Sequence, residues 1–177
     1  SDGQALTRSG AAVSDRVWIT GTIGDAALAL ALAEQSLANV GSETRWLLDR
    51  LQRPTPRIGI GQALYGLASA VIDISDGLLA DLGQIVGASG QAGAMIETTS
   101  LPLSPAGESY LLEDRMTAAL TGGDDYELCM TVPQAKSDRV RRLSEEAGVP
   151  LTDIGCITDQ AGITLTRAGV PIAGPSR

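Results

Sequence analysis

The 177-residue chain contains no histidine, no phenylalanine and only two cysteines. Without histidine, neither a zinc site nor a His-dependent catalytic triad can be built from these residues. Cys129 and Cys156 both lie in apolar, strand-like contexts. We interpret them as buried free thiols of a reducing compartment, which predicts a cytoplasmic protein.

Positive charge and long apolar runs are also scarce. The chain has 13 basic and 21 acidic residues, giving a net charge of −8. This balance argues against binding to nucleic acid or to an anionic membrane. The longest apolar stretch, residues 26–33, is too short to span a bilayer, and the first residues show no signal-peptide pattern. A protein of this composition would handle phosphates locally, through metal ions and a few placed arginines.

What the chain does contain is aliphatic residues in alternating patterns. Apolar residues make up 44% of the sequence but aromatics only 3%, so Ala, Leu, Ile and Val must form the core. The patterns predict strands at 17–21, 69–74, 92–97, 125–132, 151–157 and 163–166, and helices at 25–38, 41–52, 58–67, 78–86, 106–113 and 137–147. We therefore expect one α/β (α+β) domain over residues 1–177, with a mixed sheet flanked by helices.

Residues 73–77 (Asp-Ile-Ser-Asp-Gly) place two carboxylates and a hydroxyl between a strand-like and a helix-like segment. Such a junction collects side-chain oxygens and unsatisfied backbone N–H groups, which suit a hydrated divalent cation that carries a nucleotide phosphate. Helix capping is the alternative, but capping needs only one oxygen. Asp73, Ser75 and Asp76 are therefore candidate binding residues.

A second acidic segment follows the paired glycines Gly122 and Gly123 and contains Asp124, Asp125 and Glu127. Paired glycines allow close backbone approaches or positive φ angles. The adjacent aspartates repel each other, so a structural origin would be costly unless both are solvated. Taken alone, the segment is better interpreted as a Gly-Gly turn with surface acids.

Two smaller signals involve arginine. Arg8 lies among small and hydroxyl residues, a setting suited to a phosphate, although alone it is interpreted as a solvated terminal residue. Residues 53–57 (Arg-Pro-Thr-Pro-Arg) predict a rigid extended turn between two helices. Residues 20–25 look superficially like a phosphate loop but lack both the Gly-Lys-Ser/Thr of a P-loop and the third spaced glycine of a dinucleotide site.

Taken in order, residues 5–10, 53–57, 72–78 and 121–128 resemble the C-terminal part of the thiamine-monophosphate kinase family, within the aminoimidazole-ribonucleotide-synthetase-like superfamily. The resemblance covers nearly the whole chain. The signatures at 73–77 and 122–128 are specific to the kinase branch. The resemblance implies the C-terminal domain of that fold. It also implies that an N-terminal domain with further metal ligands, much of the ATP site and the main dimer interface is absent from these residues.

The resemblance further implies transfer of the γ-phosphate of ATP to the phosphate of thiamine monophosphate, with several Mg²⁺ ions. Both reactants are anionic, so metal ions and positioning can supply most of the catalysis without a histidine base. By resemblance, Asp73 and Asp76 match Mg²⁺ ligands, and Ser75 and Arg8 match nucleotide contacts. Asp124 stands where the family usually has a Glu that contacts thiamine monophosphate. The full-length protein is then expected to be a homodimer, and this chain alone to be folded but inactive.

Two other functions remain open at this stage. One is another ATP-using enzyme of the superfamily, such as a purine-pathway synthetase or a hydrogenase-maturation protein. The Ser between the two aspartates and the lack of a C-terminal Cys argue against it. The other is a free-standing, non-catalytic domain that binds metabolites or partners.

Overall fold

The computed structural model describes residues 5–34, 41–90, 93–108 and 110–175, which form a seven-stranded mixed sheet. Its order is β2-β4-β1-β5-β3-β6-β7, and only β3 and β6 run parallel among the described neighbours. The strands are β1 (Arg16–Thr20), β2 (Ala70–Asp73), β3 (Gly93–Glu97), β4 (Leu128–Val132), β5 (Leu151–Thr158), β6 (Gly162–Arg167) and β7 (Val170–Ile172). The predicted mixed sheet is thus confirmed.

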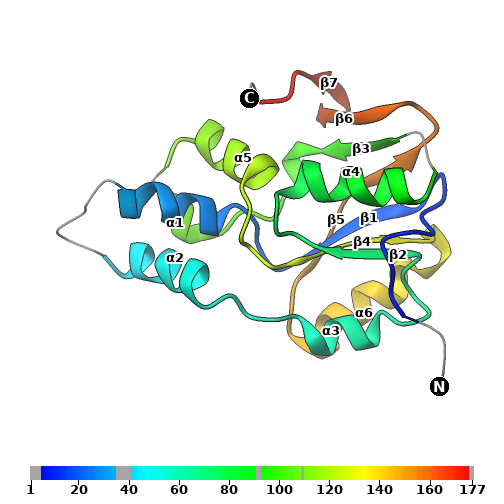
Figure 1. Cartoon of the computed structure of the whole chain (residues 1–177), viewed down its shortest axis with the longest axis horizontal. Helices are drawn as coiled ribbons and strands as arrows, with labels where there is room; N and C mark the ends of the chain where they lie inside the picture. The colour runs from blue at the N-terminus through cyan, green and yellow to red at the C-terminus, as the bar shows by residue number, and fades with distance from the viewer. Residues whose placement is uncertain (1–4, 35–40, 91–92, 109, 176–177) are drawn as a thin grey trace.

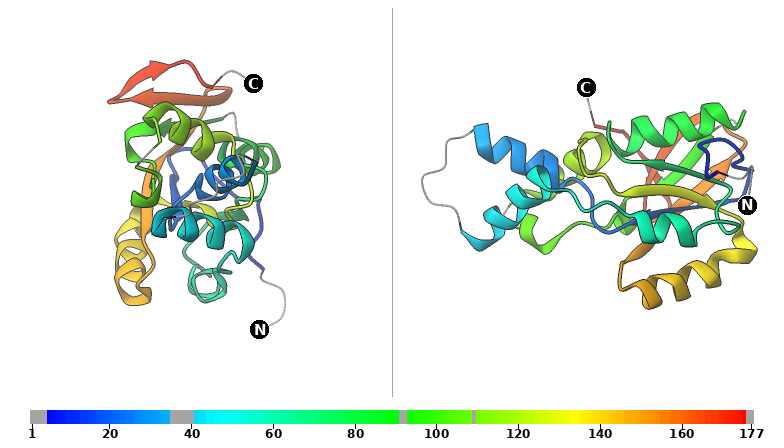
Figure 2. Two further views of the ribbon diagram at one scale, coloured as in Figure 1. Left: turned by 90° about the vertical axis from the view of Figure 1, so that its left-hand side faces the viewer. Right: turned by 60° about the horizontal axis from the view of Figure 1, so that its bottom comes forward.

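Helices cover both faces of the sheet. They are α1 (Asp25–Glu34), α2 (Ser42–Gln52), α3 (Ile58–Ala63), α4 (Leu78–Ala88), α5 (Leu112–Thr121) and α6 (Ser137–Ala147). In Figure 1, α4 and α5 lie above the sheet and α3 and α6 below it, while α1 and α2 lie together beyond one end. In the left view of Figure 2, which looks from that end, α1 and α2 lie in front of the sheet. No helix in the described residues is long and apolar enough to cross a bilayer.

Because the sheet is covered on both faces, successive residues of its inner strands enter different cores. Val17 and Ile19 of β1 pack with α4, whereas Trp18 packs with α3 and α6. A third cluster joins α1 to α2 through buried leucines that include Leu28 and Leu47. Aliphatic residues supply most of these contacts, as the composition predicts.

Two helix predictions differ from the structure, and the end of a third lies outside the described residues. The predicted helix at 106–113 is wrong: a 3-10 turn covers Pro105–Gly107, and α5 begins instead at Leu112, where it can bury Ala119 and Leu120. The helix predicted at 58–67 ends at Ala63, shortly before Gly66, whose φ of 71° lies outside a right-handed helix. α1 was predicted through residue 38, but residues 35–38 lie outside the described ranges.

The N-terminal segment runs along the free edge of β2. The N–H of Val71 donates to the carbonyl oxygen of Thr7 at 2.8 Å, and Leu6 packs beside Val71 against the core under the sheet. This contact places the neighbouring Arg8 beside the end of β2.

The loop after β2 and the loop before β4 pack backbone to backbone. Gly77 has a φ of 109°, and a methyl group there would stand 2.8 Å from the carbonyl oxygen of Thr121. A methyl group at Gly123 would overlap the carbonyl oxygen of Ser75. Glycine is therefore required at both positions for the two acidic segments to meet.

The N-terminus of α1 bonds to a carboxylate from the distant 122–127 loop. Asp125, which is 2% exposed, accepts hydrogen bonds from the N–H groups of Gly24 at 2.6 Å and Ala26 at 3.2 Å. Asp25, the first residue of α1, accepts instead from the hydroxyls of Thr22 and Ser104. The helix therefore fixes the loop that contains Asp125.

Gly123→Ala should destabilise the domain by about 1–3 kcal/mol, because the new methyl group forces the two loops apart. Chemical denaturation would measure the change. Gly83→Ala in α4 is a matched control: its added methyl group meets nothing within 4 Å, so it should stabilise the helix by up to about 1 kcal/mol. Equal effects of the two substitutions would contradict the close loop contact.

The pH dependence of stability should carry a contribution from Asp125. Burial raises the pKa of Asp125 to about 6, against the smaller opposing effect of its two N–H donors. The folded state then holds this proton more tightly than the unfolded state, so the free energy of unfolding falls as pH rises from about 4 to above 6, by up to about 3 kcal/mol.

Asp125→Asn removes this titration, so the wild-type protein should lose stability relative to the variant between pH 5 and 7.5. Urea denaturation across that range would measure the difference. A difference that stays constant, or that grows in the opposite direction, would show that the folded state does not favour the protonated carboxyl group.

Candidate functional site

The loop between β2 and α4 presents two carboxylates to solvent. Asp73 and Asp76 are both exposed, and the side chain of neither forms a hydrogen bond or an ion pair with another described residue. Asp73, the half-buried Ser75 and Arg8 line one open cavity of about 490 Å³. Three of the predicted binding residues therefore come together, while Asp76 and Asp124 do not line this cavity.

Asp81 organises this loop from beneath. Its Oδ2 accepts hydrogen bonds from the N–H groups of Ser75 and Asp76, each at 3.0 Å, and the residue is only 1% exposed. Burial raises the pKa of Asp81, the two N–H donors lower it, and the negative charges of Asp76 and Asp73 raise it further. The N–H groups of Ser75 and Asp76 are thus already bonded within the chain. The Ser75 hydroxyl and the Arg8 guanidinium group, which both line the cavity, are candidate donors to a phosphate.

Gln84 connects Asp81 to Arg8. Arg8 Nη1 donates to Gln84 Oε1 at 2.8 Å, and Gln84 Nε2 donates to Asp81 Oδ1 at 3.4 Å. Arg8 is exposed, as expected for a solvated residue, but its guanidinium group is held over the cavity by α4.

The second acidic segment continues the pairing of β4 with β2 past the end of the strands. Ile74 N–H donates to the Glu127 carbonyl oxygen at 2.7 Å, and Tyr126 N–H donates to the Ile74 carbonyl oxygen at 2.9 Å. Asp124 N–H donates to the Ser75 carbonyl oxygen at 3.1 Å. The two acidic segments, about fifty residues apart in the chain, therefore form one surface.

The side chains of the second segment divide into exposed and buried. Asp124 is exposed with a φ of 65°, and the Tyr126 hydroxyl lies 3.4 Å from its Oδ1. The interpretation as surface acids is correct for Asp124. It is wrong for Asp125 and Glu127, which are 2% and 0% exposed.

Glu127 accepts hydrogen bonds from two arginines. Arg57 donates through Nε at 2.7 Å and Nη2 at 2.6 Å, and Arg50 donates through Nη2 at 3.0 Å. The hydroxyl of Thr20 donates to the same carboxylate. Hydrogen bonding to Glu127 raises the pKa of Arg57. The rigid segment at 53–57 thus has the structural role predicted for it: Arg57 holds the base of the 124–127 loop.

Sequence reasoning missed Asp81 and Arg50, and it missed that Arg57 pairs with Glu127. Asp81 carried a readable signal, because it lies on the same helical face as Leu78, Leu82 and Ile85, where an unpartnered carboxylate would be costly. The arginine partners of Glu127 lie 70 and 77 residues away, and no local pattern reveals such pairs.

The exposed acids offer the kind of ligand atom that Mg²⁺ takes. Mg²⁺ prefers hard oxygen ligands and usually keeps several waters or borrows phosphate oxygens. Among the described residues, no group of three or more His, Cys, Asp or Glu side chains has metal-binding geometry. A cation bound here would therefore depend on water or phosphate oxygens for most of its ligands, with Asp73 and Asp76 as the exposed carboxylates on this loop.

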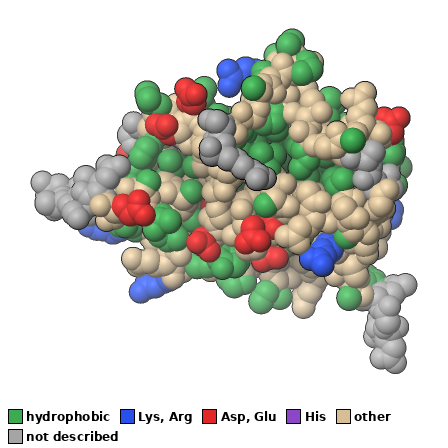
Figure 3. Space-filling view, turned by 45° about the horizontal axis from the view of Figure 1, so that its top comes forward, with side chains coloured by type: hydrophobic (Ala, Val, Ile, Leu, Met, Phe, Trp, Pro, Cys, Tyr) green, Lys and Arg blue, Asp and Glu red, His purple; other side chains and the backbone are tan. Residues whose placement is uncertain are grey.

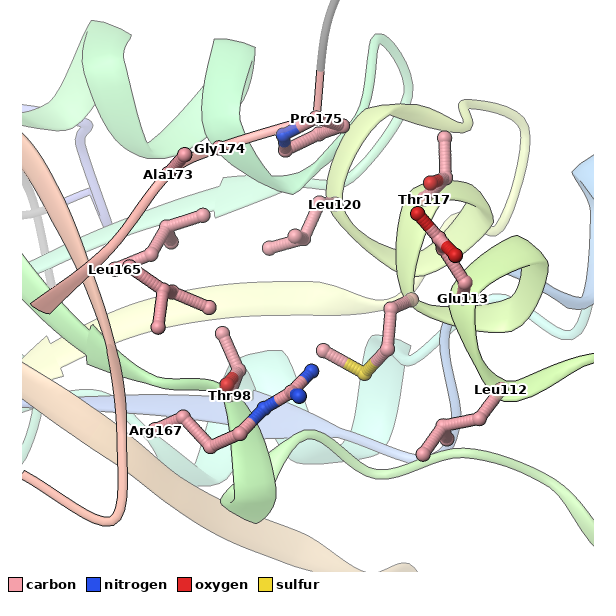
Figure 4. A pocket seen from close by; sticks show the side chains of 12 residues that line it. Thr98, Leu112, Glu113, Thr117, Leu120, Leu165, Arg167, Ala173, Gly174 and Pro175 are labelled. Carbon is pink, nitrogen blue, oxygen red and sulfur yellow. The ribbon is translucent and has the colours of Figure 1, made fainter. Parts of the chain in front are cut away.

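A larger hollow of about 750 Å³ lies between α5 and β6, beside residues 173–175 (Figure 4). Leu120 and Leu165 form apolar walls, and Glu113, Thr117 and Arg167 supply polar groups. None of the exposed acids near β2 lines it. The face shown in Figure 3 has scattered acidic side chains and few basic ones, so positive charge is not gathered there.

Comparisons with known proteins place this geometry in a family. The model of "AIR synthase related protein, C-terminal domain" matches residues 12–167. Thiamine-monophosphate kinase of Salmonella typhimurium is 45% identical over 174 residues, covering 96% of this chain and 53% of the relative. That of Caulobacter vibrioides is 35% identical, covering 99% and 50%. The chain thus spans about half the length of the curated relatives it matches.

Solved structures agree. Thiamine-monophosphate kinase from Stenotrophomonas maltophilia K279a is 43% identical with a TM-score of 0.86, covering 92% of this chain and 53% of that one. AaThiL complexed with AMPPCP and TMP is 29% identical with a TM-score of 0.79, covering 96% and 52%. The Escherichia coli hydrogenase maturation protein HypE, at 22% identity and a TM-score of 0.67, shares the fold. Because the family model matches most of its residues, the chain belongs to the C-terminal domain family of AIR synthase related proteins.

Proposed function

We propose that the chain is the C-terminal domain of a thiamine-monophosphate kinase. The enzyme would transfer the γ-phosphoryl group of ATP to the phosphate of thiamine monophosphate, giving thiamine diphosphate and ADP. The observation that carries the proposal is the open cavity that brings Asp73, Ser75 and Arg8 together beside the loop of Asp124. The similarity to named kinases at up to 45% identity, and to a structure bound to AMPPCP and TMP, supports it.

Each of the candidate residues then has a role. Asp73 and Asp76 would hold Mg²⁺, which when bound neutralises charge on the transferring phosphoryl group. The Ser75 hydroxyl and the Arg8 guanidinium group would bind nucleotide phosphate oxygens. Asp124 would contact the thiamine substrate. No base is required, because the accepting phosphate oxygen is already anionic.

The remaining parts of the site would come from outside this chain. Because two carboxylates leave most of a magnesium shell open, further ligands would come from an N-terminal domain of the same polypeptide, which would also form a homodimer. The chain alone would then be inactive. Two free cysteines and a net charge of −8 support a cytoplasmic enzyme of small phosphates rather than a nucleic-acid or membrane protein.

The proposed function is tested with the full-length protein that contains this chain. Incubation with thiamine monophosphate, ATP and Mg²⁺ should form thiamine diphosphate, which chromatography detects. Unphosphorylated thiamine should not react, because it lacks the accepting phosphate. Lack of thiamine diphosphate, or equal turnover of both acceptors, would overturn the proposal.

Substitutions at the two acidic loops should have different kinetic effects in that protein. Asp73→Asn or Asp76→Asn removes a charge needed to hold the metal, so kcat should fall by about a hundredfold to a thousandfold, or roughly 3–4 kcal/mol. Asp124→Asn should raise KM for thiamine monophosphate and leave KM for ATP nearly unchanged. Steady-state kinetics with each substrate varied would separate these effects.

Asp159→Asn is the matched control, because Asp159 is exposed on the turn between β5 and β6, away from both loops. It should keep wild-type constants. Near-normal kcat and KM values for the three site variants would show that these acids are surface charges.

A further inference from the structure

We propose that Asp81 is a positioning residue of the metal–nucleotide site, and that Gln84 extends its effect to Arg8. Asp81 would not touch the substrate or the metal. It would fix the backbone from which Asp73, Ser75 and Asp76 project. The proposal rests on the proposed function for its kinetic consequences, but its structural part concerns this chain alone.

The first argument is the cost of placing a carboxylate at this position. Asp81 is 1% exposed on the helical face that also buries Leu78, Leu82 and Ile85. A buried carboxylate is strongly unfavourable without partners. Here the two backbone donors at 3.0 Å offset that cost, and both belong to the binding loop. The two hydrogen bonds that offset the cost of burying Asp81 are therefore the same ones that hold the binding loop in shape.

The second argument is geometric. Two hydrogen bonds from successive amides to one oxygen fix the peptide planes on either side of Ser75. The Ser75 carbonyl oxygen is held in turn by Asp124 N–H at 3.1 Å, and that of Ile74 by Tyr126 N–H at 2.9 Å. With the amides held from one side and the carbonyl groups from the other, the directions of the Ser75 and Asp76 side chains are set before any ligand binds.

Gln84 links Asp81 to Arg8 on the opposite wall of the cavity. Its amide accepts from Arg8 at 2.8 Å and donates to Asp81 at 3.4 Å, and Asp73, Ser75, Arg8, Asp81 and Gln84 all line the same cavity. One turn of α4 thus supports both the carboxylate side and the guanidinium side. The distance between the residues proposed for the metal and the residue proposed for the phosphate is fixed by a single helix.

A purely structural cap would make the same hydrogen bonds, so the test needs a control of the same kind. Asp15 provides it. It is 6% exposed and accepts hydrogen bonds from Ala12 N–H at 3.0 Å and from the Ser69 hydroxyl at 2.6 Å. Ser69 directly precedes β2, whereas the loop held by Asp81 follows it. Asp15→Asn should lower stability as Asp81→Asn does, without changing metal binding.

The first experiment uses nuclear magnetic resonance on the chain itself. In Asp81→Asn, hydrogen exchange at the amides of Ser75 and Asp76 should be at least about tenfold faster than in the wild type. The Mn²⁺ concentration, with ATP present, that broadens the signals of this loop should rise about tenfold, as is usual when a supporting group behind metal ligands is lost. Asp15→Asn should leave both measurements unchanged.

The second experiment measures kinetics of the full-length protein. Asp81→Asn should raise KM for Mg²⁺-ATP about tenfold and leave KM for thiamine monophosphate unchanged, and excess Mg²⁺ should restore much of the rate. If the wild type forms no thiamine diphosphate, the proposed function fails, while the exchange and Mn²⁺ measurements still decide the role of Asp81. Wild-type Mn²⁺ and Mg²⁺-ATP dependence in a destabilised Asp81→Asn would overturn the positioning role.

Gln84→Leu keeps the proposal testable if Asp81→Asn does not fold. Gln84 is exposed, so the melting temperature should not change, while binding of Mn²⁺-ATP should weaken about fivefold through loss of the hold on Arg8. Gln52→Ala, at an exposed glutamine of α2, is the control and should have no effect. Unchanged Mn²⁺-ATP binding in Gln84→Leu would overturn the link to Arg8.

Discussion

The candidate site depends on the backbone hydrogen bonds that join residues 74–75 to residues 124–127. They continue the β2–β4 pairing beyond the regular strands and bring two acidic segments onto one surface. Every other feature of the site is attached to this junction. Asp81 fixes it from α4, Asp125 connects it to α1, and Glu127 connects it to the arginines of α2 and of the segment before α3.

The acids at this junction fall into two electrostatic classes. Asp81, Asp125 and Glu127 are buried, and each has donors that offset the loss of water: backbone N–H groups for the two aspartates and arginines for Glu127. Asp73 and Asp76 are exposed and make no such bonds among the described residues. The buried acids hold the two loops in place, and the exposed acids leave their charge free to attract a cation.

The sequence predicts the exposed half of the site better than the buried half. Asp73, Ser75 and Asp76 are consecutive or nearly so, and a strand-to-helix junction has a local pattern, so their shared location could be read directly. The strand alternation likewise predicted most of the sheet. The buried contacts could not be predicted from local patterns. Arg57 and Glu127 are seventy residues apart in the chain, and Asp125 caps a helix that begins about a hundred residues earlier. The helix predicted at 106–113 was placed too early in the sequence. Residues 105–107 form a 3-10 turn, and local sequence does not show that α5 begins only at Leu112.

The contact between Thr7 and Val71 has a consequence for solubility. β2 is an edge strand, and an uncovered edge offers unpaired N–H and C=O groups to strands of other molecules. The segment that carries Arg8 crosses this edge and occupies the N–H of Val71. The segment that brings Arg8 to the cavity therefore also protects β2 against strand addition. A chain trimmed before β1 would lose Arg8 and expose an edge prone to aggregation.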